Sequence, residues 1–178
     1  MLVSEIGVAL HYLCIAAFAG SLIYAATSDI RSLEIPNRVS IIIAAAFLPA
    51  ALITGLPIST IGLHYGIGIG VFAVGAFLFS RGLVGGGDVK LLAAVCIWWS
   101  IGDLGKYLIT VALLGGLLAL VTIVARKTPV LNRALPWLTD DSVSEQSIPY
   151  GVAIAIAGFV LFDKIPVLPT GLLNLFDG

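Results

Sequence analysis

Charged side chains are scarce in this sequence: Asp, Glu, Lys and Arg together make up 11% of its 178 residues. Soluble domains carry about 25% charged residues, so a soluble domain is excluded. The hydrophobic share is 60% and the mean hydropathy is +1.12. These values predict an integral membrane protein whose surface meets the lipid bilayer.

Residues that bind metals or form disulfides are also few. The two cysteines, Cys14 and Cys96, lie alone in apolar runs, and the two histidines are His11 and His64. Because there is no CxxC pair and no Cys/His cluster, we expect no zinc site, no disulfide and no other cofactor. Both histidines are expected to pack against the chain or at the membrane interface. The net charge of -1 gives no basis for nucleic-acid binding.

Long uncharged runs fill most of the chain and predict an all-α, polytopic membrane bundle with about six transmembrane helices. Gly55 and Pro57 divide one run that is too long for a single crossing. We expect Trp98 and Trp99 at the water interface and a tight turn at residues 102–105. The chain is read as one membrane domain, residues 1–178, with spans near 6–27, 36–54, 59–80, 89–101, 106–125 and 148–162 and a polar loop at 126–147.

The basic residues predict how the chain lies in the cell membrane. Seven of the nine fall in three loops, and these are Arg31, Arg38, Arg81, Lys90, Arg126, Lys127 and Arg133. Loops rich in Lys and Arg stay in the cytoplasm, so both termini are expected on the outer side. Asp29, after the first run, and Asp88, before the fourth, then lie at the same cytoplasmic face.

An aspartate beside a membrane helix is costly, so a pair of them at one face suggests a function. Two carboxyls held close together share one proton, and such a pair can act as base and acid in peptide hydrolysis without a metal. Which of Asp29 and Asp88 is the base stays open. The N-terminus of the fourth helix is expected to favour the ionised form of Asp88.

Three short motifs occur in order along the chain. Residues 29–37 read Asp-Ile-Arg-Ser-Leu-Glu-Ile-Pro-Asn, residues 85–90 read Gly-Gly-Gly-Asp-Val-Lys, and residues 148–151 read Ile-Pro-Tyr-Gly. Together they resemble the signatures of the prepilin peptidases, a family of GxGD-type membrane aspartyl proteases. The resemblance implies an aspartic endopeptidase that removes the basic leader from type IV pilin precursors, with Asp29 and Asp88 as its catalytic residues.

Larger members of that family carry a cytoplasmic insertion with paired cysteines and also methylate the cleaved pilin. Here the first apolar run leads directly into the Asp29 motif. The chain therefore resembles the small, peptidase-only form that serves tight-adherence (Flp-type) pili or archaeal pre-flagellins.

Further residues are expected to support the site. Gly85, Gly86 and Gly87 lack a Cβ atom and let a substrate strand approach closely. Lys90 either stabilises a carboxylate or extends to the membrane interface. Pro36 fits the first turn of the second helix, and Pro36 and Asn37 are expected to shape and cap that helix. The acidic residues Glu34, Asp140, Asp141 and Glu145 either form a solvated surface or attract the basic leader.

Two other functions stay open. Proton-coupled transporters also use carboxylates in the membrane, but they need polar groups at the midplane and an inverted repeat, and neither is evident. A non-catalytic assembly subunit would use Asp29 and Asp88 only as helix-terminal residues. The oligomeric state is not predicted.

Overall fold

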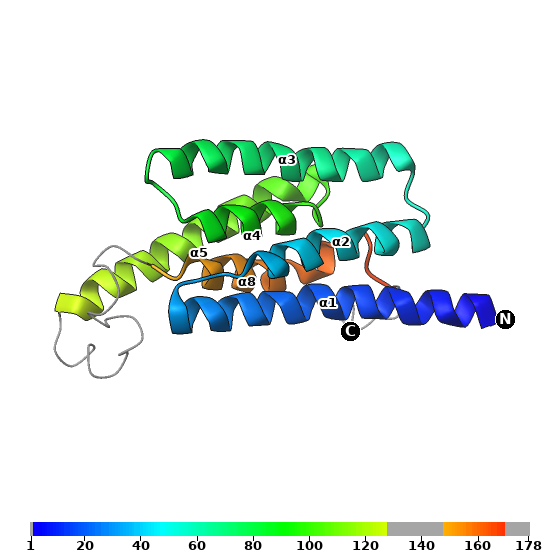
Figure 1. Cartoon of the computed structure of the whole chain (residues 1–178), viewed down its shortest axis with the longest axis horizontal. Helices are drawn as coiled ribbons and strands as arrows, with labels where there is room; N and C mark the ends of the chain where they lie inside the picture. Colours follow the sequence, from blue (N-terminus) through cyan, green and yellow to red (C-terminus); the bar gives the residue numbers. More distant parts are fainter. Residues whose placement is uncertain (1, 128–147, 170–178) are drawn as a thin grey trace.

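The computed structural model describes residues 2–127 and 148–169, and every regular element in these two ranges is helical (Figure 1). This confirms the predicted all-α membrane bundle. In chain order the elements are α1 (Leu2–Ser32), α2 (Asn37–Ile53), α3 (Ile58–Ser80), α4 (Gly86–Cys96), α5 (Ile101–Lys127), α8 (Tyr150–Val160) and the 3-10 helix η1 (Phe162–Lys164).

Three of the helices are long and apolar enough to cross a bilayer: α1, α3 and α5. Helices α4 and α8 have 11 residues each. At 1.5 Å per residue, each is about 16 Å long, roughly half the thickness of the hydrocarbon core. Length therefore supports three crossings directly, and the total of six stays a prediction.

The two short helices lie inside the bundle. Helix α4 packs against α3 and α2, α8 packs against α1 and α5, and α4 and α8 contact each other. Almost every side chain from Leu91 to Trp99 is buried. The long helices thus surround a core that holds the first turns of α4 and α8 in fixed positions.

The tryptophan pair is part of this core, and its predicted place at the water interface is wrong. Trp98 and Trp99 are both fully buried. The Trp98 indole donates a hydrogen bond to the Ile43 carbonyl at 2.9 Å, and its ring lies 4.3 Å from that of Phe18. Trp99 stacks on Tyr107 with the ring centroids 4.9 Å apart. Packing between helices has overridden the usual interfacial preference of tryptophan.

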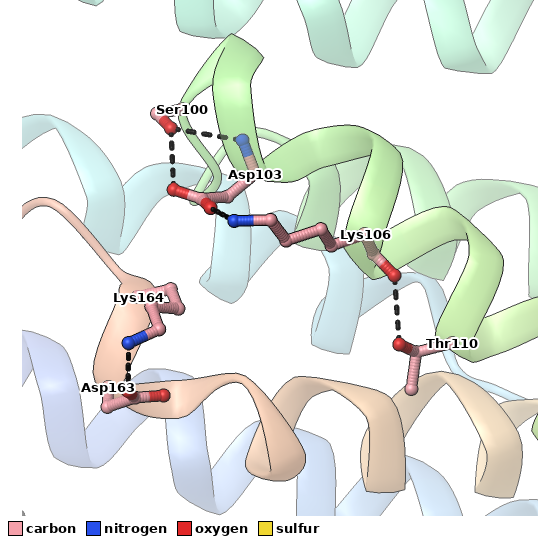
Figure 2. Close-up of polar contacts among 6 residues, drawn as sticks. All are labelled: Ser100, Asp103, Lys106, Thr110, Asp163 and Lys164. Atoms are coloured by element: carbon pink, nitrogen blue, oxygen red, sulfur yellow. Dashed lines mark hydrogen bonds and ion pairs between the residues drawn. The ribbon is translucent and has the colours of Figure 1, made fainter.

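The predicted turn at residues 102–105 is instead the first turn of α5. The Ser100 hydroxyl accepts a hydrogen bond from the Asp103 amide at 3.3 Å and donates one to the Asp103 carboxylate at 3.0 Å (Figure 2). This exchange resembles a capping box and starts the helix five residues early. Lys106 pairs with Asp103 at 2.8 Å, and Lys164 pairs with Asp163 at 2.6 Å.

Both histidines are packed inside the protein, as predicted. His11 Nε2 lies 2.6 Å from the Val167 carbonyl oxygen, and His64 Nδ1 lies 2.7 Å from that of Ile97. These contacts fix the end of the bundle that lies away from the two aspartates.

The connection from α1 to α2 and the connection from α3 to α4 lie at the same end of the bundle as the last turns of α5 (Figure 1). Basic residues occur at all three of these places in the sequence. The helices thus bring together the loops that hold the first two motifs. The side of the membrane that this end faces stays a prediction.

Candidate active site

Asp29 lies in the last turns of α1, because the helix continues to Ser32 instead of ending near residue 27. Its side chain is 4% exposed. The helix ends at Leu33, whose φ of 52° is left-handed and whose amide donates to the Asp29 carbonyl at 3.0 Å. A left-handed leucine costs about 1–2 kcal/mol. Local strain of this kind often accompanies functional sites, and here it lies four residues after Asp29.

Asp88 is the third residue of α4 and follows a sharp turn. Helix α3 ends before Gly82, whose φ of 70° suits glycine, and Gly85 is the N-cap residue of α4. A Cβ atom added at Gly85 would lie 2.6 Å from Asp88 Oδ2. The Asp88 carboxyl therefore lies over the Gly85 backbone, and only glycine leaves room for it there.

The two aspartates line one cavity, as the sequence predicts for a pair at one membrane face. Its volume is about 550 Å³, within the usual range for ligand sites. The α1 end contributes Asp29 and Leu33. The rest of the lining comes from α3, the 82–85 loop, α4, α5 and the start of α8: Val71, Gly75, Leu78, Gly82, Leu83, Val84, Gly85, Asp88, Val89, Leu92, Val111, Ile148, Tyr150 and Ile154.

The third motif also reaches Asp29. The Gly151 amide donates a hydrogen bond to Asp29 Oδ2 at 2.6 Å. A Cβ atom at Gly151 would lie 2.8 Å from that oxygen and 2.7 Å from Ile35 Cδ1. Because Gly151 is in the first turn of α8, the positive end of this helix faces the carboxyl group.

Ile35 belongs to the first motif and contacts a glycine in each of the other two. Its side chain packs against Gly151, and a Cβ atom at Gly87 would lie 3.4 Å from Ile35 Cβ. The glycines at these two positions let α4 and α8 approach the loop between α1 and α2. No specific role was predicted for Ile35 or Gly151, since a contact between residues so far apart in the chain leaves no local pattern.

Other expected supporting residues lie beside the site. Lys90 Nζ donates to Asn37 Oδ1 at 2.9 Å, which joins α4 to α2. Pro36 is the N-cap residue of α2 and not part of its first turn. In the part of the chain that the structure describes, no side chain caps α2, so the expected cap from Asn37 is wrong. Gly86 lies against the Phe79 ring.

Of the four acidic residues that are expected to attract the leader, the structure describes Glu34. The Glu34 side chain is exposed, and its carbonyl accepts a hydrogen bond from Ser28 Oγ at 2.7 Å. The loop residues Asp140, Asp141 and Glu145 lie outside the described residues.

The ionisation of Asp88 differs from the expectation based on its helix. Asp88 is half-buried at the loop end of α4, outside the three long spanning helices. Burial and, second, the charge of Asp29 raise the pKa of Asp88 from 3.8 to about 7. Within residues 2–127 and 148–169, no group donates a hydrogen bond to this carboxyl that would offset the two effects. With a pKa of about 7, Asp88 at the N-terminus of α4 is protonated in about half of the molecules at neutral pH.

Comparison with known proteins is consistent with this arrangement. A family model described as the type IV leader peptidase family matches residues 16–124, which include both aspartates. No curated protein and no solved structure was found to match the chain. Among the described residues, no three His, Cys, Asp or Glu side chains form a group that could hold a metal ion. Since the family match covers more than half of an apolar helical bundle, the chain belongs to the type IV leader peptidase family and is a membrane peptidase.

Proposed function

We propose that the protein is an aspartic endopeptidase that removes the basic leader from type IV prepilin precursors, with Asp29 and Asp88 as its catalytic pair. Family membership supports leader peptidase activity in general. The aspartic mechanism rests on one observation: these two carboxyl groups line the same cavity, and the charge of one acts on the other.

The contacts of the two carboxyls favour different roles for them. Asp29 accepts the Gly151 amide hydrogen bond at the N-terminus of α8, and such a bond stabilises the negative carboxylate. Asp88 has no comparable donor among the described residues, and its pKa is raised to about 7. Asp29 is therefore the base in our proposal, and Asp88 holds the shared proton.

The reaction then follows from these roles. Asp29 takes a proton from water as the water oxygen bonds to the scissile carbonyl carbon, and Asp88 gives its proton to the carbonyl oxygen. The tetrahedral intermediate has two hydroxyl groups. Asp29 then passes its proton to the leaving amine while Asp88 recovers a hydroxyl proton, so the C–N bond breaks and the pair returns to its first state.

The membrane setting is part of the same proposal. In this proposal the chain acts as one multi-pass domain in the cell membrane, and the distribution of the basic residues favours a cavity at the cytoplasmic face with the termini on the outer side. The precursor has a basic leader followed by an apolar helix, and the exposed Glu34 near the cavity attracts the leader. The direct passage from α1 to the Asp29 motif favours the peptidase-only form that serves Flp-like pili.

Cleavage by the purified protein tests the proposal. The protein and a full-length prepilin are mixed in detergent, and the new N-terminus of the product is identified by mass spectrometry. We expect one cut at the junction of leader and apolar helix. A protein that leaves the precursor intact, but moves protons into liposomes, would be the transporter instead; an intact precursor without proton movement indicates an assembly subunit.

The pH dependence of cleavage tests the assigned roles. The protonated form of Asp88 is required, and its pKa of about 7 means that it loses this proton as the pH rises through neutrality. The initial rate is therefore expected to fall by about tenfold for each pH unit well above that value. Rates are measured in one detergent from about pH 5 to about pH 9. A rate that keeps rising above neutral pH contradicts the role of Asp88 as the acid.

A further inference from the structure

The cavity continues from the aspartates into the apolar part of the bundle. On α3 it is lined by Val71, Gly75 and Leu78, which lie on one face of the helix because they are four and three residues apart. This face extends over about 10 Å of helix. Leu92 on α4 and Val111 on α5 complete the apolar lining. The cavity is thus polar at its loop end and apolar along its length.

Among residues 2–127 and 148–169, no second helix lies behind the wall formed by α3. Helix α3 makes its main packing contacts with α4, whereas α5 makes its own with α8, and no extensive α3–α5 contact occurs among the described residues. Figure 1 shows α3 along one edge of the bundle. Its outer face is exposed, with Ile69 69% and Phe77 57% accessible. The space between α3 and α5 therefore has α4 as its floor.

Glycines fix the distance between α3 and this floor. Cβ atoms at Gly68 and Gly75 would lie 2.5 Å from Ile97 Cγ1 and 2.6 Å from Val89 Cγ1. Helix α3 therefore lies close against α4 along the same face that lines the cavity. This close packing holds Val71 and Leu78 beside the cavity instead of letting α3 close over it.

We propose that the apolar helix of the precursor docks between α3 and α5, against the face formed by Val71, Gly75 and Leu78. This inference rests on the proposed function, because the occupant is the substrate of that peptidase. The cavity changes from apolar to polar where it reaches the aspartates, as the precursor changes from apolar helix to basic leader at the cleaved junction. A helix is about 10 Å wide and too large to be enclosed by a cavity of about 550 Å³. In the proposal its first turn therefore lies in the opening between α3 and α5, against Val71, and only its unwound end enters the cavity toward the aspartates.

Photo-crosslinking tests the docking face without requiring cleavage. A photoreactive phenylalanine is placed at Val71 or at Ile69 of the full-length protein in the Asp88→Asn background, and the full-length precursor is added. The two positions are on the same helix, and the exposed Ile69 lies on the opposite face because it is two residues from Val71. We expect the Val71 probe to crosslink the apolar helix of the precursor several-fold more strongly than the Ile69 probe. Equal crosslinking, a stronger Ile69 signal, or a Val71 probe that labels only lipid overturns the proposal.

A pair of tryptophan variants gives a second test in the active protein. Val71→Trp is expected to slow cleavage of the full-length precursor several-fold, and Ile69→Trp to leave it near the wild-type rate. A short peptide that ends just after the junction does not reach Val71, so Val71→Trp should affect its cleavage much less. Equal losses on both substrates contradict docking at Val71, whereas absence of cleavage in the unmodified protein counts against the peptidase function itself.

Discussion

Asp88→Asn is expected to abolish cleavage, with a loss of about 10²- to 10⁴-fold or more in the initial rate. Asparagine has almost the shape of aspartate, so the Gly85 turn and the cavity are preserved. It cannot donate the proton that the scissile carbonyl oxygen needs. Asp29→Asn should have an equally large effect, because an amide cannot take a proton from water. The initial rate of prepilin cleavage is measured at equal amounts of folded protein.

Asp103→Asn is a matched control for this prediction. Asp103 is the third residue of α5, as Asp88 is the third residue of α4, so both substitutions remove a carboxylate from the first turn of a helix. Asp103 is at the end of the bundle away from the cavity, beside Lys106 (Figure 2). Its variant is expected to cleave at nearly the wild-type rate. Wild-type cleavage by Asp88→Asn would refute the catalytic pair.

Gly151→Ala is expected to reduce cleavage by about 10²-fold, because a shift of about 1 Å in a catalytic group has a cost of this order. The new methyl group would lie 2.8 Å from Asp29 Oδ2 and 2.7 Å from Ile35 Cδ1. Either the carboxyl or the first turn of α8 must move. The amide hydrogen bond that orients Asp29 is weakened in both cases. Initial rates and thermal unfolding are measured together.

Gly158→Ala separates this effect from general crowding on α8. A Cβ atom at Gly158 would lie 2.8 Å from Leu22 Cδ1, which is equally tight but involves an apolar side chain and neither aspartate. Overpacking of this kind costs about 1–3 kcal/mol of stability. Gly158→Ala should therefore lower the unfolding temperature without a comparable loss of rate. Equal losses of rate in the two variants argue against a positioning role for Gly151.

The two aspartates could be singled out from the sequence because each stands out against long apolar runs. Their common end of the bundle followed from the number of helices between them. The last turn of α1 was missed, since the polar residues after 27 suggested a loop, while the chain continues the helix past Asp29 to a left-handed leucine. The start of α5 was missed although Ser100 and Asp103 have the spacing of a capping box.

Long-range contacts account for the remaining differences. The burial of Trp98 depends on Phe18 and Ile43, which come from two other helices. The bond from Gly151 to Asp29 joins residues 122 positions apart. Neither contact has a signature within a window of sequence, because tertiary packing selects among local preferences that are compatible with several arrangements.

The position of Gly151 also has a consequence for biosynthesis. Both aspartates have been made once the ribosome passes residue 88, but the amide that holds Asp29 belongs to α8, the last α-helix among the described residues. A nascent chain that lacks α8 therefore has both carboxyls without the hydrogen bond that orients Asp29. If this pair catalyses hydrolysis as we propose, activity arises only when α8 inserts between α1 and α5, so that a partly made enzyme cannot attack neighbouring membrane proteins during its own assembly.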